Sequence, residues 1–247
     1  MRTSATIYCA ALATVCAMSA PRGARAQASP VLVQAEPPRP FGLELSAGGR
    51  TERFGGAGYQ AFSDDRWMAE TALAAGYRVA GGPEAGLAVG AAWNHGRASS
   101  TARGIDSTLD LDRLCVSVAA RRSLWRRLSV FARLAPGVVR LNAALSDSSV
   151  LNANQYGNDA SLSQTHWALA LEGAAGAAFR VGQLARPGEH VFALWLTAEG
   201  GYGFAGSTAA ALSSKQGAAP ARTEAPVRLG TVTPGGVFMN FAAALTF

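Results

Sequence analysis

Residues 237–247, VFMNFAAALTF, decide the fold of this chain. Apolar side chains occupy every second position of this stretch, at 237, 239, 241, 243, 245 and 247. Successive side chains of a β-strand point to opposite faces, so this alternation predicts a strand with one continuous apolar face. A single strand cannot bury such a face, and the question is which other segments share the pattern.

The same alternation occurs in seven segments upstream. The eight predicted strands are 41–50, 66–79, 86–96, 107–120, 127–141, 166–181, 191–204 and about 231–247. The connections alternate in length: 51–65, 97–106, 142–165 and 205–230 are long, whereas 80–85, 121–126 and 182–190 are short. Short turns at one end and long loops at the other are typical of transmembrane barrels. We therefore predict an all-β fold, an eight-stranded antiparallel up-and-down transmembrane β-barrel over residues 41–247.

Aromatic side chains on the predicted lipid-facing side gather near the two ends of the strands. The group at the loop ends is Trp67, Trp93, Trp167, Tyr202 and Phe204, and the group at the turn ends is Phe41, Tyr77, Phe179, Phe192 and Phe247. Within one strand, ten residues separate Trp67 from Tyr77, which corresponds to roughly 25 Å of height for a tilted strand. This spacing matches the apolar band of a membrane barrel and predicts two aromatic girdles. The alternative is that these are core aromatics of a β-sandwich.

The opposite side of the predicted strands carries charges among Gly, Ala and Ser residues. These charges are Glu44, Glu70, Arg78, Arg113, Arg133, Glu172, Arg180 and Glu199. An eight-stranded barrel is just wide enough to be filled by its own side chains, and buried charges must pair because an isolated buried ion is very costly. Carboxylates and guanidiniums are equal in number here, so we predict an interior ion-pair network that fills the lumen. A narrow conducting pore is the alternative.

Proline interrupts one of the predicted strands at Pro136. Proline cannot donate a ladder hydrogen bond, so we expect a bulge or irregularity near residues 135–137. The apolar parity also changes there, because Val139 and Leu141 follow on the other alternation.

The predicted short turn 121–126 places Trp125 among arginines, namely Arg121, Arg122, Arg126 and Arg127. A tryptophan beside cations is typical of an anchor at a membrane interface. A solvated turn is the alternative interpretation.

The strand pattern, the girdles and the terminal Phe247 together resemble the eight-stranded outer-membrane barrels of the OmpA transmembrane-domain and OmpX type. The resemblance covers about residues 41–247. It implies an outer-membrane location among lipids and lipopolysaccharide. It also implies that the barrel-assembly machinery recognises the C-terminal strand through Val237, Met239, Phe241, Leu245 and Phe247. Members of this class serve in tethering, adhesion, surface defence or small pores, so the resemblance implies no single function.

The first 40 residues are predicted to lie outside the barrel. Residues 1–26 have the features of a signal peptide, with Arg2, an apolar stretch and a cleavage site at Ala24-Arg25-Ala26. Residues 27–40 form a predicted proline-rich periplasmic linker. Only Cys115 of the three cysteines would remain after cleavage, so no intramolecular disulfide is expected. No basic stripe with interleaved aromatics occurs, which argues against nucleic-acid binding.

The function that the sequence favours is a non-enzymatic structural or surface-interaction barrel without a cofactor, recognising an extracellular ligand through loops 142–165 and 205–230. One alternative is a narrow porin-like pore for small solutes. A second is a lipid A-modifying enzyme, for which His95 with Ser99 or Ser100 would be the first candidates.

A further hypothesis concerns carboxylates at the loop end of the fourth predicted strand, at Asp106, Asp110 and Asp112. At that height they would be placed to hold a divalent cation between lipopolysaccharide phosphates. Their spacing does not match an EF-hand loop, and solvated surface charges are the alternative.

Overall fold

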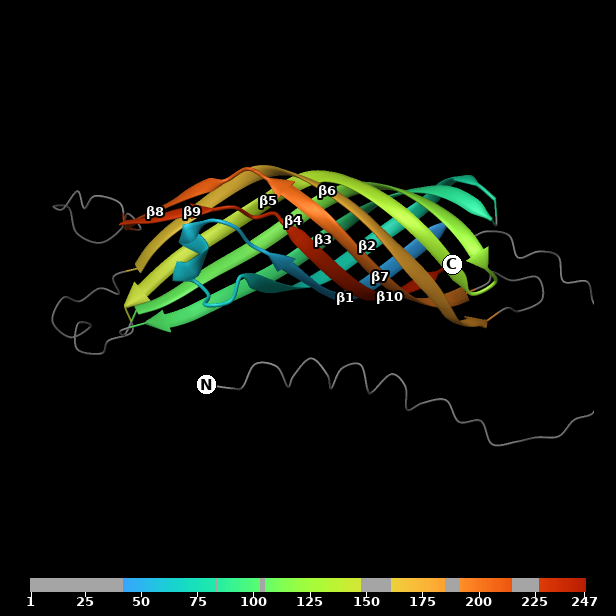
Figure 1. Ribbon diagram of the computed structural model, residues 1–247, viewed down its shortest axis with the longest axis horizontal. Coiled ribbons are helices and arrows are strands. Elements are labelled where there is room, and N and C mark those ends of the chain that lie inside the picture. Colours follow the sequence, from blue (N-terminus) through green and yellow to red (C-terminus); the bar gives the residue numbers. More distant parts are fainter. Residues whose placement is uncertain (1–41, 83, 103–104, 148–160, 185–191, 215–226) are drawn as a thin grey trace, which may run out of the picture. The chain divides into compact units, whose positions relative to one another are not determined.

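The computed structural model describes residues 42–82, 84–102, 105–147, 161–184, 192–214 and 227–247, most of which lie in antiparallel strands (Figure 1). The chain divides into residues 1–37 and 38–247, and all described residues belong to the second unit. The predicted signal peptide, the predicted linker and Phe41 therefore lie outside the described residues. No helix in the described part is long and apolar enough to cross a membrane.

Eight strands form one closed antiparallel ring, in the order β5-β4-β3-β2-β1-β10-β7-β6, with β6 paired back to β5. This confirms the predicted eight-stranded up-and-down barrel. The strand bounds are β1 Leu43–Arg53, β2 Trp67–Gly81, β3 Ala85–Ala102, β4 Ile105–Trp125, β5 Leu128–Asp147, β6 Ser161–Leu184, β7 Phe192–Ala205, β8 Thr208–Ser214, β9 Val227–Val232 and β10 Val237–Thr246. A single 3₁₀ turn, η2 (Ala57–Ala61), accompanies these strands.

The two ends of the barrel differ in their connections. The C-terminus, the connection β4–β5 and the adjoining ends of β2 and β3 and of β6 and β7 lie at one end, which we call the turn end (Figure 1). The hairpin of β8 and β9 and the turn η2 lie at the opposite end, which we call the loop end. This asymmetry is the one expected from the alternating connection lengths.

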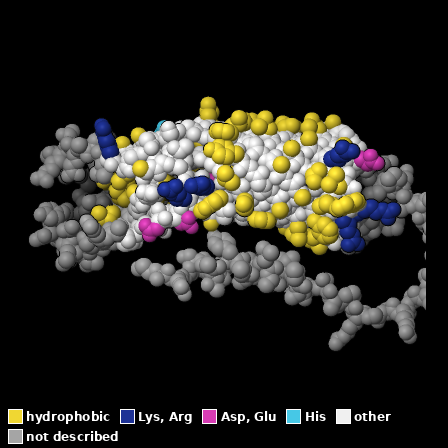
Figure 2. Space-filling view, viewed as in Figure 1, with side chains coloured by type: hydrophobic (Ala, Val, Ile, Leu, Met, Phe, Trp, Pro, Cys, Tyr) yellow, Lys and Arg dark blue, Asp and Glu magenta, His cyan; other side chains and the backbone are white. Residues whose placement is uncertain are grey.

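The outer wall of the barrel is apolar. Along β1 and β10 every second side chain is exposed, and the exposed set in β10 includes Met239 and Phe241. Leu169 is 80% exposed and Val116 is 62% exposed although both lie in the middle of paired strands. Figure 2 shows apolar side chains spread over the flank of the barrel, with arginines near its turn end. Such a contiguous apolar surface is typical of a barrel that is solvated by lipid.

Several predicted loop segments are in fact strand. β3 and β4 pair up to Ala102 and Ile105, so most of 97–106 is a continuation of the hairpin. Residues 142–147 belong to β5, residues 161–165 belong to β6, and 205–230 contains β8 and β9. β8 also pairs with β6 through Leu162 and Ser214. The strands extend this far because their inward apolar side chains pack against one another in a core at the loop end.

Pro136 interrupts the ladder between β4 and β5, as the predicted irregularity requires, but it does not produce a bulge. β4 and β5 keep one register on both sides of it, from Cys115↔Gly137 to Val118↔Leu134, and only the two intervening pairs are missing. On the other side, Pro136 pairs with Leu171 without interruption. The apolar residues do change from even to odd positions after Pro136, but the strand itself does not change its orientation. Odd positions of β5 face inward throughout, and Val139 and Leu141 are buried, so the strand keeps its orientation while the lumen becomes apolar.

That apolar part of the lumen forms a core at the loop end, consisting of Phe54, Tyr59, Phe62, Met68, Leu109, Leu111, Val139, Leu141, Ala143, Ala210, Leu212 and Val232. The turn η2 folds over it and contacts β9. This close approach requires glycine at Gly56, where φ is 90° and an added Cβ would lie 2.1 Å from the carbonyl oxygen of Thr231. η2 lies within the predicted loop 51–65, and this core is not predicted from the sequence.

Candidate functional site

The centre of the lumen is filled by buried charges from six strands, β1, β2, β4, β5, β6 and β7. Arg113 of β4 donates from Nη1 to Glu172 Oε1 at 2.7 Å and from Nη2 to Glu52 Oε1 at 3.0 Å. Arg50 of β1 donates from Nη2 to Glu52 Oε2 at 2.7 Å, and its Nη1 lies 2.7 Å from Glu172 Oε1. All four side chains are at most 2% exposed, so each charge is balanced by direct contact and not by water.

Two further carboxylates extend this network. Glu199 of β7 accepts from Arg133 Nη2 at 2.8 Å and from Asn240 Nδ2 at 3.0 Å. Glu70 of β2 lies 3.5 Å from Arg50 Nε, and neither of its oxygens has a hydrogen-bond donor. We call the set Arg50, Glu52, Glu70, Arg113, Arg133, Glu172 and Glu199 the central network. It holds four carboxylates and three guanidiniums.

The central network is closed on its loop side. The Arg50 guanidinium carbon lies 3.9 Å from the ring centroid of Phe238, which is fully buried. On the loop side of Phe238 lies the apolar core, which contains residues of several strands and of η2. In this core the ring centroids of Phe54 and Tyr59 are 4.8 Å apart and the rings are stacked. Close-packed apolar side chains leave no continuous path for water. Among the described residues, this core fills the lumen between the central network and the loop end.

The turn side of the lumen is open. A cavity of about 680 Å³ extends from Arg133, Glu199 and Asn240 at its inner end to Gly42 and Arg126 at the turn end. Many of its lining residues are Gly, Ala or Ser, and its aromatic lining residues are Trp125, Phe131 and Trp195. The small side chains along this part of the inner face leave the volume unfilled.

The predicted interior charges thus fall into two groups. Glu70, Arg113, Arg133, Glu172 and Glu199 meet in the central network, whereas Glu44, Arg78 and Arg180 line the turn-side cavity. Glu44 pairs with Arg121 at 2.8 Å. Three interior charges are absent from the sequence prediction, namely Arg50, Glu52 and Arg121. Arg50 is the last residue of the predicted strand 41–50, and Glu52 and Arg121 lie in the predicted connections 51–65 and 121–126. The parity that they share with Glu44 and Arg113 was the signal that identifies them.

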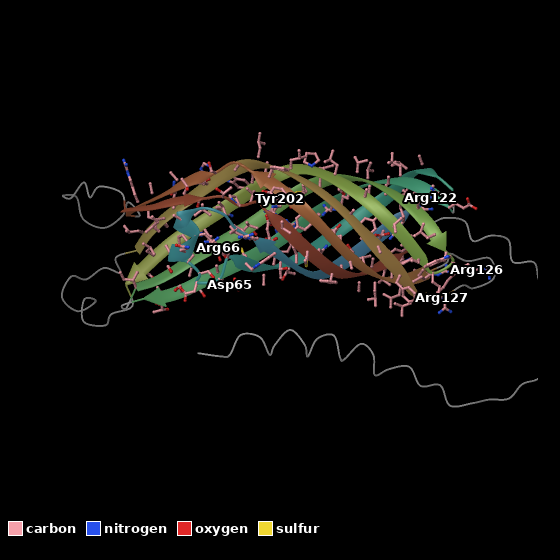
Figure 3. All side chains as sticks on the ribbon, in the orientation of Figure 1. Asp65, Arg66, Arg122, Arg126, Arg127 and Tyr202 are labelled. Atoms are coloured by element: carbon pink, nitrogen blue, oxygen red, sulfur yellow. The ribbon has the colours of Figure 1, made fainter. Side chains whose placement is uncertain are left out.

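The outward aromatic residues are exposed on the barrel wall. Among the predicted girdle residues, Trp67, Tyr77, Trp93, Trp167, Phe179, Phe192, Tyr202 and Phe204 are each at least 39% exposed. Phe247 is half-buried and its ring packs edge-on against Phe192 at 5.3 Å. Figure 3 places Tyr202 away from Arg122, Arg126 and Arg127, which lie together at the turn end. Trp125 is 73% exposed.

The predicted assembly-signal residues of β10 share the outer face of the barrel. Val237, Met239, Phe241 and Leu245 are 43–64% exposed. β10 closes the ring by pairing with β1 on one side and β7 on the other. The apolar row that the sequence displays therefore faces lipid once the barrel is closed.

His95 does not form the predicted pair with a serine. Its Nδ1 lies 2.9 Å from Asp112 Oδ1, and its ring stacks on Trp93 on the outer wall. Ser99 lies four residues along the same extended strand, roughly 13 Å away, which is beyond hydrogen-bond reach. Ser100 alternates to the inner face, where its carbonyl accepts from Ser107. His95 is therefore paired with a carboxylate and with neither of the two candidate serines.

The three loop-end aspartates point outward but do not converge. Asp106 accepts from Thr101 at 2.6 Å, Asp110 pairs with Arg97 at 3.4 Å, and Asp112 contacts His95. In the described part of the chain, no group of three or more His, Cys, Asp or Glu side chains is arranged to hold a metal ion. Each aspartate thus has its own partner on β3.

Several solved structures are similar to this barrel. Neisserial surface protein A is 12% identical, with 83% of this chain and 96% of that chain covered and a TM-score of 0.46. The attachment invasion locus protein Ail of Yersinia pestis is 15% identical, with 84% and 99% covered and a TM-score of 0.43. Ail in complex with the heparin analogue sucrose octasulfate is 17% identical over the same shares, with a TM-score of 0.42. No protein-family model and no curated protein sequence matches the chain.

Proposed function

We propose that this protein is a non-conducting, non-enzymatic barrel of a bacterial outer membrane whose loop end presents an interaction surface to the outside. The observation that carries the proposal is the sealed loop half of the lumen. A central network that is at most 14% exposed and an apolar core above it leave no aqueous path through the barrel. A folded, rigid loop end is a scaffold for recognition and not the vestibule of a pore.

The membrane location rests on the outer wall. Exposed Leu, Val and Phe side chains alternate with inward small or charged residues around all eight strands. Lipid is the solvent that stabilises such a wall, since a barrel has no unpaired strand edge and satisfies its backbone groups internally. Membrane lipids and lipopolysaccharide are the immediate partners in this proposal, and the C-terminal strand is the contact for the assembly machinery.

The recognition surface is built on the predicted loops 142–165 and 205–230. The described parts of 142–165 extend β5 and β6 of the barrel, whereas those of 205–230 include the hairpin of β8 and β9. The Ala211 amide of β8 donates to the Gln164 side chain of β6 at 2.8 Å. The segments 148–160 and 215–226 lie outside the described residues, and the strands that border them are paired and packed.

Planar-bilayer recording of the purified, folded protein tests the seal. We expect no steady current steps. Steps that disappear on heat denaturation and change size in Arg133→Gln would contradict the proposal and support a pore.

Protease added to intact cells tests the orientation. The segment 215–226 contains Lys215 and Arg222, at which trypsin cleaves. We expect cleavage there on whole cells, with the rest of the barrel protected. Cleavage only after the cells are opened would contradict the proposed exposure of the loop end.

A further inference from the structure

The turn-side cavity carries more positive charge than it can neutralise itself. Four guanidiniums line it below the central network, those of Arg78, Arg121, Arg126 and Arg180, against the two carboxylates of Glu44 and Glu84. Glu44 is itself paired with Arg121. Arg78 donates only to the carbonyl oxygen of Gly82, at 3.3 Å. Arg180 has no carboxylate within ion-pair distance in the described part of the chain, and its nearest described partner is the ring of Trp195 at 5.8 Å.

These arginines are held in place rather than spread out into solvent. The Trp195 ring has two of them nearby, with the guanidinium carbon of Arg121 at 5.2 Å and that of Arg180 at 5.8 Å from its centroid. Trp195 is itself oriented by a 3.3 Å hydrogen bond from Nε1 to Thr246 Oγ1. Arg121 and Glu44 both act electrostatically on Arg78, with opposite signs. Cations that repel one another and converge on one space form a receptor for an anion.

The shape of the cavity limits what the anion can be. It is closed at its inner end by Arg133, Glu199 and Asn240 and opens at the turn end, so a ligand enters from that side alone. Its volume of about 680 Å³ is large for a bare inorganic ion and falls in the range of small-molecule sites. Four guanidiniums against two carboxylates below the central network leave an excess of two positive charges, which matches the charge of close to −2 that a phosphate monoester carries near neutral pH.

We propose that the turn-side cavity is a blind binding site for a phosphate monoester of a small polar molecule, held by Arg78, Arg121 and Arg180. The guanidiniums donate to the phosphate oxygens, and the Gly, Ala and Ser walls receive the remainder of the ligand. The site lies at the end of the barrel opposite to the proposed recognition surface. Its occupancy therefore does not depend on the proposed function of the loops.

Calorimetric titration of the full mature protein in detergent at low ionic strength tests the proposal, with glycerol 3-phosphate as the probe. We expect saturable one-site binding. Arg78→Gln and Arg180→Gln should each weaken it roughly tenfold, because each removes a charge-assisted contact to the phosphate. Arg122→Gln is the matched control: it lies next to Arg121 on β4 but alternates to the exposed outer face, and it should leave binding unchanged.

A second variant distinguishes a site from a misfolded protein. Glu44→Gln removes the carboxylate that engages Arg121, so it should tighten binding several-fold, a gain that a folding defect does not produce. Glycerophosphocholine, a phosphodiester with one negative charge, separates a soluble ligand from a lipid headgroup and should bind far more weakly. Absence of saturable binding by the folded barrel, equal losses in Arg122→Gln and Arg180→Gln, or equal affinity for the diester would overturn the assignment.

Discussion

The arginines in the two halves of the lumen differ in their burial and in their carboxylate partners. In the loop half, Arg50 and Arg113 are at most 2% exposed and each contacts at least two carboxylates. In the turn half, Arg78 and Arg180 border a cavity and have no carboxylate partner among the described residues. Removing a charge from water without giving it a partner is very costly. The comparison therefore indicates that this barrel keeps a guanidinium without a carboxylate partner only where solvent or a ligand reaches it.

The largest expected difference between the halves follows from removing a guanidinium in each. Arg113→Met leaves Glu52 and Glu172 buried with fewer donors and should destabilise the barrel by about 3–5 kcal/mol. Arg180→Met, in the turn half, should cost less than about 1 kcal/mol because no carboxylate loses its partner. Urea unfolding in detergent, followed by the heat-dependent shift in gel mobility, measures both. Equal losses for the two variants would remove the distinction between the halves.

A large-to-small substitution sharpens the same contrast for apolar side chains. Phe62 is fully buried next to η2, so Phe62→Ala should lower the free energy of unfolding by about 3 kcal/mol. Phe131→Ala should cost clearly less, since Phe131 is half-buried and already borders the cavity. Hydrogen exchange of the Phe62 and Ser63 amides, which both donate to the Tyr59 carbonyl, reports local opening of the loop-end core. Unchanged exchange in Phe62→Ala would show that the core does not hold η2 in place.

The outer wall provides a test of the solvent around the barrel. Val116→Arg should destabilise the protein in lipid bilayers by about 2 kcal/mol, because the charge would lie in the apolar band. Thr108→Arg, which lies on the same outward alternation of β4 but at the loop end, should be close to neutral. Unfolding in vesicles measures the pair. A neutral Val116→Arg would mean that water, and not lipid, surrounds the centre of the barrel.

The smallest effect at neutral pH concerns Tyr59 in η2. Burial raises the pKa of its phenol from 10.0 to about 12. A raised pKa of an acid means that the neutral form is favoured in the folded state, so this stability is complete below pH 10.0 and is lost as the pH rises toward 12. Intrinsic amide exchange is base-catalysed and rises with pH in every protein, so the protection of the η2 amides relative to that intrinsic rate is the quantity to compare. This protection should fall in that window in the wild type and not in Tyr59→Phe. An identical alkaline response in both proteins would assign the loss to another group.

Sequence periodicity predicted the strands well because the outer face has a single requirement. Every lipid-facing position must be apolar, so the alternation in 237–247 and its seven counterparts was visible without the fold. The same rule failed where the surroundings change. Beyond the girdle the outward residues become Asp, Ser and Thr while the inward ones become Leu and Val, which made strands look like the loops 97–106 and 142–165.

The sequence by itself determined the strand number, the connection lengths and which face of each strand meets lipid, since these depend on neighbours in the chain. Only the tertiary structure decided which charges meet. Arg113 and Glu52 are 61 residues apart, and their contact depends on the register of every strand between them and on closure of the ring. The same closure divides the lumen into a sealed half and an open half, because a cavity is a property of all eight strands together.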